Sequence, residues 1–316
     1  MSTGPVSGGL SQGMRERDLA GPAAALSYHE ELPDAVPSWR QAVSQFAESR
    51  MGMAGLGALV VIVLFSFLGP VIYRTNQFAA NLLLENGPPS IQHLLGTTPQ
   101  GRDELGALMV GGQSTLEIGL GVAVISTLFG LVWGALAGYV GGILDALMMR
   151  IVDALLSIPF LFFVVLLASM VTPTLWLIML VIAAVSWLPT ARLARGETLT
   201  LRTHDYVAAS EVFGARRTYI LQHHIAPNLL GIVVVNATLK VADAISLFAA
   251  ISFLGLGVPP PATNWGNILT DGVNNLFDGY WWQLWPAAVL IVVTVLAANL
   301  VGDALRDVVE PRLKQR

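Results

Sequence analysis

The sequence predicts an all-α integral membrane protein with six transmembrane helices. Of its 316 residues, 54% are hydrophobic and only 12% are charged, whereas an average soluble domain has about 25% charged residues. Long uncharged, apolar runs also recur along the chain, and about 20 such residues are enough to cross a bilayer. Six core helices of this kind are not expected in one soluble chain, so the runs are interpreted as membrane spans.

The breaks between these runs define the individual spans. The uncharged stretch Ala154–Ala191 is too long for one span, and "VTPT" at 171–174 divides it because proline cannot continue the helical hydrogen-bond ladder. The first of the two resulting spans is expected to begin near Arg150. The predicted spans are Met51–Tyr73, Ile118–Leu144, Arg150 to the "VTPT" break, that break to Ala191, about Leu229–Leu256 and about Trp282–Val301.

Positive charge sets the predicted orientation. Fourteen of the 17 Lys and Arg residues lie in the N-terminal tail, the 140–154 loop, the 190–228 segment and the C-terminus, which this map places on one side. Because cytoplasmic loops are enriched in Lys and Arg, both termini and the 190–228 segment are expected in the cytoplasm. The aromatic stretch "WWQLW" (281–285) is then expected at the outer membrane interface, where amphipathic rings are favoured.

Composition further divides the chain into four parts. Residues 1–37 are rich in Gly, Ser and Pro and lack an apolar signal-peptide core, so they are expected to be a disordered cytoplasmic tail. Residues 38–112 hold an amphipathic lead-in, the first span and an extracytoplasmic loop. Residues 113–302 form the transmembrane core, which includes a polar loop at 194–228, and residues 303–316 form a cytoplasmic tail.

Several classes of function find no support. The chain has no Cys, and its net charge of −4 gives no reason to expect a nucleic-acid partner. His223 and His224 are adjacent, so they diverge on a helix and do not suit one metal ion. Only two lysines occur and neither follows a glycine, so there is no G-x-x-x-x-G-K phosphate loop. The chain is therefore expected to be non-catalytic, without metal or cofactor, and any ATP hydrolysis is expected in a separate chain.

A glycine stripe marks the second span. Four glycines at four-residue spacing form one smooth helix face, which allows another helix to approach closely. The partner helix could belong to this chain, or the face could slide against a second subunit during transport. The glycines are Gly130, Gly134, Gly138 and Gly142.

The fifth span carries two ionisable residues close to mid-bilayer. Lys240 and Asp243 are three residues apart and share one helix face. Ionisable groups at this depth are costly and face the bundle interior or water. They form either a structural ion pair or a charged lining of a solute path that contacts a carboxylate or an amine. Asn236 is a further candidate for the path.

The polar segment "HDYVAASEVFGARRTYILQHHIAP" (204–227) interrupts the apolar chain. A short helix is expected over 205–213, with Asp205 as N-cap and Gly214 as the C-terminal stop. Its small residues at 208–210 would let it seat deeply in a groove. A second helix over 215–226 leads to Pro227, which is expected to open the fifth span where its missing N–H costs least.

This segment resembles the EAA loop of permeases of ATP-binding-cassette importers. The motif is EAA, three residues, Gly, nine residues and I-x-L-P, and it aligns with Ala208-Ala209-Ser210, Gly214 and His224-Ile225-Ala226-Pro227. Ala208 replaces the motif's Glu, and Ala226 replaces the Leu before Pro. Four further stretches resemble the C-type permease subunit of dipeptide and oligopeptide importers: "HLLGTTPQGRDELGALMVGG" (93–112), "AGYVGGILDALMMRIVDALLSIP" (137–159), "SFLGLGVPPPATNWGNIL" (252–269) and "NLVGDALRDVVEPR" (299–312).

The resemblance covers residues 38–312 and implies a complete transport system in a bacterial or archaeal plasma membrane. The chain would pair with a homologous B-type permease subunit, and an extracytoplasmic binding protein would deliver peptides. Two cytoplasmic ATPases, which hold ATP and Mg, would dock on the 194–228 loop between the fourth and fifth spans. The implied contact residues are Asp205, Tyr206, Ala208, Ala209, Ser210, Glu211, Gly214 and Pro227.

Two departures leave alternatives open. With Ala208 in place of the motif's Glu, the contact of that acid is either lost or moved to Asp205 or Glu211. Family members commonly carry Glu where this chain has Phe248, and small residues at the positions of Lys240 and Asp243, so the solute could instead be a nickel chelate, glutathione or haem. A function of another class is an ion-coupled secondary transporter that uses Lys240 and Asp243.

Overall fold

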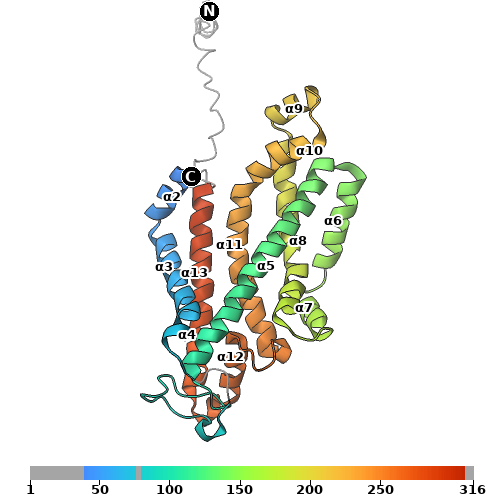
Figure 1. Ribbon diagram of the computed structural model, residues 1–316. Helices are drawn as coiled ribbons and strands as arrows, with labels where there is room; N and C mark the ends of the chain where they lie inside the picture. Colours follow the sequence, from blue (N-terminus) through green and yellow to red (C-terminus); the bar gives the residue numbers. More distant parts are fainter. Residues whose placement is uncertain (1–38, 76–79, 310–316) are drawn as a thin grey trace, which may run out of the picture.

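The computed structural model describes residues 39–75 and 80–309, and the secondary structure in these ranges is helical. Its main helices form an elongated bundle in which α5 crosses the middle, α2, α3 and α13 lie along one side, and α6 and α7 lie along the other (Figure 1). The α-helices are α2 (Trp39–Glu48), α3 (Arg50–Phe67), α4 (Gly69–Ile72), α5 (Glu104–Val140), α6 (Gly142–Leu156), α7 (Phe160–Ser169), α8 (Leu175–Arg202), α9 (Asp205–Val212), α10 (Arg217–Ile220), α11 (Ala226–Ile251), α12 (Trp265–Asn274) and α13 (Trp285–Val309).

Five helical segments are long and apolar enough to cross a membrane, and the bent pair α6–α7 raises the number to six if it forms one span. The break at "VTPT" is confirmed, since α7 ends at Ser169 and α8 begins at Leu175. The first and sixth spans are confirmed in place, although the last helix continues to Val309 through part of the expected C-terminal tail. The expected tail at 1–37 lies outside the described residues.

Three predicted boundaries in the second and third spans were wrong. The second span begins at Glu104, because Asp103 caps α5 by accepting a hydrogen bond from the backbone N–H of Gly106 at 2.8 Å. It ends at Gly141, whose φ of +69° leaves the helical region. The third span begins at Gly142 and bends by 84° between α6 and α7, where Pro159 precedes Phe160 and interrupts the helix.

The predicted opening of the fifth span at Pro227 agrees with α11, which begins at Ala226 and has Pro227 in its first positions. A helical segment runs from Arg217 to Leu256 without a break long enough to separate its parts. It contains a π-helical stretch, Leu221–Ile225, immediately before α11. Pro227 therefore lies inside this long helix near the start of α11. The wider π turn precedes the position where the proline N–H is missing, and such turns accommodate a local break in hydrogen-bond register.

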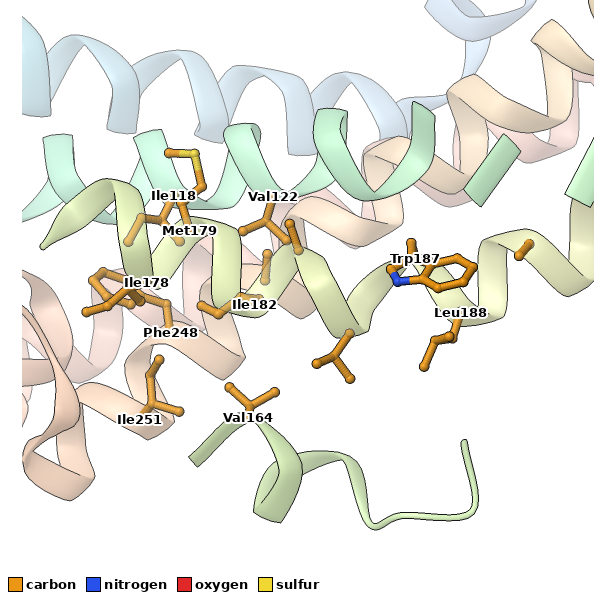
Figure 2. Close-up of a cluster of buried hydrophobic side chains, with 14 of the residues drawn as sticks. Ile118, Val122, Val164, Ile178, Met179, Ile182, Trp187, Leu188, Phe248 and Ile251 are labelled. Carbon is orange, nitrogen blue, oxygen red and sulfur yellow. The ribbon is translucent and has the colours of Figure 1, made fainter. Parts of the chain in front are cut away.

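The main core lies between α5, α8, α7 and α11 (Figure 2). Ile118 and Val122 of α5 meet Ile178 and Ile182 of α8, and all four side chains are fully buried. Phe248 of α11 closes the cluster from the other side and is also fully buried. Phe248 therefore supports the packing of α11 against this core.

The two ends of the bundle carry different structures. Helices α9 and α10 (205–220) form a projecting helical pair, here named the knuckle. The knuckle, the start of α2 and the end of α13 lie at one end of the bundle, and α12 lies at the other (Figure 1). Near α12, the expected aromatic belt is divided: Trp281 and Trp285 are exposed, but Trp282 is buried and its indole N–H donates to the carbonyl of Thr97 at 3.4 Å. Trp282 therefore packs against the loop that contains Thr97 and does not lie on the surface of the bundle.

Candidate coupling site and charged cavity

Helix α9 projects from the bundle and is held by a complete C-terminal cap. Gly214 has φ +78°, and its N–H donates to the carbonyl of Glu211 at 3.0 Å, while the N–H of Ala215 donates to the carbonyl of Ser210 at 3.0 Å. These two bonds form a Schellman motif, in which glycine avoids the cost of a left-handed residue. The predicted stop at Gly214 is confirmed. The predicted cap at Asp205 was wrong, because His204 occupies the N-cap position and Asp205 is the first helical residue.

The outward surface of α9 ends in an apolar tip. Val212 is 85% exposed and Phe213 is 89% exposed, although both are large hydrophobic side chains. Ala208, Ala209 and Glu211 are exposed beside them. An exposed apolar group of this kind on a projecting element is typical of a protein contact. The sequence-based selection of polar contact residues missed this tip, since apolar residues in a helix are usually assigned to a core.

A small apolar cluster seats the knuckle on the bundle. Val207 is the buried residue of α9, and it packs with Ile220, Ile225 and Leu229 of the following helical segment. Tyr139 at the end of α5 completes this contact. Helix α9 is therefore packed against both α5 and α11.

Polar and aromatic contacts reinforce this seat. The hydroxyl of Ser210 lies 3.2 Å from Nε2 of His224, and the rings of Tyr206 and His224 are 5.9 Å apart. The amide of Asn228 donates to the hydroxyl of Tyr206 at 3.5 Å. Burial raises the pKa of Tyr206, so its hydroxyl stays neutral. His224 thus helps to hold α9 against the bundle through its contact with Ser210. No group of three metal-ligating side chains occurs in the part of the chain that is described.

The glycine stripe packs inside this chain, against α8. A Cβ atom added at Gly130 would lie 2.7 Å from the backbone oxygen of Trp187, and one at Gly138 would lie 2.9 Å from that of Arg195. Between them, Gly134 opposes the backbone oxygen of Ala191. The contacts advance by four residues on both helices, so α5 and α8 run parallel in close contact.

Gly142 does not belong to this stripe. Its φ is +63°, it begins α6, and an added Cβ would meet nothing within 4 Å. The expectation for this fourth glycine was therefore wrong, because the helix had already ended at Gly141. The prediction of close packing is confirmed for the other three. The alternative of a face free to slide against a second subunit is contradicted for these positions, since α8 covers them.

Lys240 and Asp243 line a cavity of about 540 Å³ between α11, α8 and the bend of α6–α7. Lys240 is only 8% exposed, whereas Asp243 is exposed. No ion pair joins the two side chains, and the ammonium group of Lys240 makes no hydrogen bond among residues 39–75 and 80–309. Asn236 instead accepts a hydrogen bond from Thr190 of α8 at 2.9 Å. The structural ion pair considered for Lys240 and Asp243 is thus not formed.

Comparison with known proteins adds an independent observation. Residues 130–315 match the model of the binding-protein-dependent transport system inner membrane component family. Residues 38–89 match the N-terminal transmembrane domain of oligopeptide transport permease C.

The chain belongs to the family of binding-protein-dependent transport system inner membrane components.

Curated relatives of this permease chain agree with the assignment. It is 38% identical to the oligopeptide transport system permease protein OppC of Bacillus subtilis, over 88% of this chain and 90% of the relative. Its identity to the OppC protein of Escherichia coli K12 is also 38%, over 87% and 91%. The dipeptide transport system permease protein DppC of Bacillus subtilis is 34% identical, over 92% and 88%.

Two ion pairs in the permease chain join α8 to α6 below the knuckle. Arg195 donates from Nε and Nη2 to the two oxygens of Asp145 at 2.5 and 2.7 Å, and Arg192 donates to Asp153 at 2.6 Å. The first pair is sheltered, with side chains 34% and 13% exposed, and the second is open, at 52% and 53%. The partners are 50 and 39 residues apart in the sequence, so neither pairing could be predicted from local spacing.

The opposite end of the permease chain holds a buried polar network that the sequence analysis also missed. Asp103 accepts from the hydroxyl of Tyr73 at 3.2 Å, and its carboxylate lies 2.8 Å from Nδ1 of His93. Glu104 is 1% exposed beside it. Burial raises the pKa of Asp271 on α12, whereas a hydrogen bond from Gln100 and the charge of Arg102 lower it. Through His93 and Gln100, the network connects the loop before α5 to the start of α5 and to α12.

Proposed function

We propose that this chain is a translocation subunit of an ATP-binding-cassette importer that carries dipeptides or oligopeptides. The observation that carries the proposal is the α9 knuckle, whose apolar tip at Val212 and Phe213 projects from a membrane-type bundle. Such a surface suits a groove on a separate protein. The peptide assignment rests on the names of the curated relatives, which are oligopeptide and dipeptide permease proteins.

The proposed assembly has three kinds of partner. A homologous B-type permease forms the other half of the pathway, and two ATPase subunits, which bind ATP and Mg, dock on the two knuckles. An extracytoplasmic binding protein delivers the solute. The α9 end faces the cytoplasm, as do both termini, which agrees with the positive charge of the 190–228 segment. The pair α6–α7 serves as the third of six spans.

Within the proposed loop, the described contacts suggest distinct roles. Ser210 and Tyr206 hold α9 against the bundle through His224 and Asn228. Ala208, Ala209 and Glu211 are exposed next to the apolar tip, so they face the ATPase. Ala208 replaces the motif's acid, so Ser210 and the apolar cluster around Val207 hold the loop against the bundle instead. Asp205 remains a candidate for an ion pair to the ATPase.

Purification and transport together test this proposal. A tagged chain, expressed with its neighbouring transport subunits, should co-purify with ATPase chains and a second permease. The reconstituted complex should take up peptide only when the binding protein and ATP are both present. Uptake by this chain alone under a proton or sodium gradient would instead support the ion-coupled transporter. A panel that includes a nickel chelate, glutathione and haem identifies a different solute if peptide uptake is absent.

A further inference from the structure

The cavity at Lys240 lies at the junction of three structural elements. Leu156 and Phe160 flank the 84° bend between α6 and α7, Ser186 and Pro189 come from α8, and Lys240 comes from α11. A proline inside a helix leaves the carbonyl four residues earlier without its helical partner. Broken and proline-containing helices at membrane depth are tolerated where they line a cavity or are buried in protein.

Lys240 is the buried charge in this cavity. Its side chain has no hydrogen bond or ion pair in the described part of the chain, although it is nine-tenths buried. Asp243 lies one turn further along α11, but it is exposed and does not pair with Lys240. The Lys240 ammonium opens onto the cavity and has no side-chain partner among the described residues, so a negatively charged group that enters the cavity gains both an ion pair and hydrogen bonds from Lys240.

The depth of Lys240 limits which negative group can reach it. Lys240 is 13 residues beyond Pro227 on the same helix, a distance of about 20 Å at about 1.5 Å per residue. It is also 16 residues before Leu256, the end of the helical segment. The hydrocarbon core of a bilayer is about 30 Å thick, so lipid phosphates lie well away from this position. A negative group arriving by the transport path is the remaining source.

We propose that Lys240 is a carboxylate-binding site within the transport path, and that it binds the C-terminal carboxylate of the transported peptide. This inference rests on the proposed function, because it requires a peptide in the path. The ammonium of Lys240 donates hydrogen bonds to the carboxylate, and such charge-assisted bonds are stronger than neutral ones. Asp243 repels the same carboxylate from the next helical turn, which places it beside Lys240.

Direct binding tests the site without the binding protein. The complex of the two permease subunits and the two ATPase subunits is purified and heated with trialanine or with trialanine amide, which lacks the terminal charge. The shift in the Tm of this complex is measured. Trialanine should raise the Tm of the wild-type and Lys240→Arg complexes but not of the Lys240→Met complex, and the amide should act equally on all three. Thr238→Ala is the matched control from the same helix, because Thr238 does not line the cavity, and it should keep the wild-type response.

Transport provides the second readout. Lys240→Met should reduce uptake of trialanine by about tenfold or more, as expected for loss of a hydrogen bond to a charged group, and should change uptake of a transported amidated peptide by less than about twofold. Lys240→Arg should restore the faster uptake of trialanine relative to the Lys240→Met complex. A Lys240→Met complex that keeps the trialanine Tm shift would overturn the inference, as would an equal loss for acid and amide. If the wild-type complex carries no peptide at all, the proposed function itself fails.

Discussion

Ser210 Oγ of α9 lies 3.2 Å from His224 Nε2 on the helical segment that becomes the fifth span. Through this contact the projecting helix is joined to a 40-residue segment that crosses the bundle from Arg217 to Leu256. Tyr206 packs beside the same histidine ring, at a centroid distance of 5.9 Å. These contacts place α9 directly against the helical segment that carries Lys240.

Replacing His224 with Ala should weaken the coupling of ATP hydrolysis to uptake. One hydrogen bond is worth about 1 kcal/mol net, which changes the population of the seated knuckle by about fivefold. The measurement is peptide uptake per ATP hydrolysed by the reconstituted complex. His223→Ala is the matched control, because its ring stacks on Tyr219 of the same segment, at 4.2 Å. Equal effects of the two substitutions would contradict the assigned contact.

Gly214→Val should also uncouple hydrolysis from uptake. The φ of +78° disfavours a side chain by about 1–2 kcal/mol, although an added Cβ meets nothing within 4 Å. Strain of the backbone is then the cause, and Gly214→Asn should be tolerated much better because Asn adopts left-handed conformations more readily. If Val and Asn at this position gave the same coupling ratio, the cap would not be the reason for the glycine.

Gly134→Ala should destabilise the bundle. Its Cβ would overlap the backbone oxygen of Ala191, and backbone cannot move aside as a flexible side chain can. Overpacking of this kind costs about 1–3 kcal/mol, so the Tm of the purified complex should fall. Gly57→Ala on α3 is the matched control, since it meets nothing within 4 Å. An unchanged Tm for Gly134→Ala would mean that α5 and α8 are not in close contact.

The two ion pairs between α8 and α6 should differ in strength. Arg195→Gln leaves Asp145, which is 13% exposed, without its bidentate partner, and should lower the Tm more than Arg192→Gln, whose pair is open to solvent. Arg195→Lys keeps the charge but loses the planar fork, so it should fall between wild type and Gln. A Tm for Arg195→Gln that matches Arg192→Gln would contradict the sheltered pair.

The features predicted from the sequence depend on local pattern. Glycines at four-residue spacing indicated a close helix contact at Gly130, Gly134 and Gly138, and the structure supplies α8 as the partner. Gly214 was recognised as a stop because only the local backbone conformation matters there. Gly142 was misassigned because Gly141 ends the helix, and nothing in the apolar composition around it signals that end.

The features that the sequence did not reveal depend on distant contacts. Asp145 and Arg195 are fifty residues apart, so their pairing follows from the packing of α6 on α8. The exposed tip at Val212 and Phe213 was missed because hydrophobicity alone does not distinguish a core residue from a docking residue. The separation of Lys240 from Asp243 required the burial of each side chain, since their three-residue spacing equally allowed an ion pair.

Attachment of a photocrosslinker at the α9 tip tests the central claim most directly. The chain has no Cys, so Phe213→Cys can be labelled with benzophenone maleimide as the single maleimide-reactive site of this chain. Phe277→Cys is the matched control, because Phe277 is 98% exposed and lies beyond α12 at the other end of the bundle. Irradiation should crosslink position 213 to an ATPase subunit and should not crosslink position 277 to it. An ATPase adduct absent from position 213, or formed equally from both positions, would contradict the account of α9 as the element that receives the ATPase.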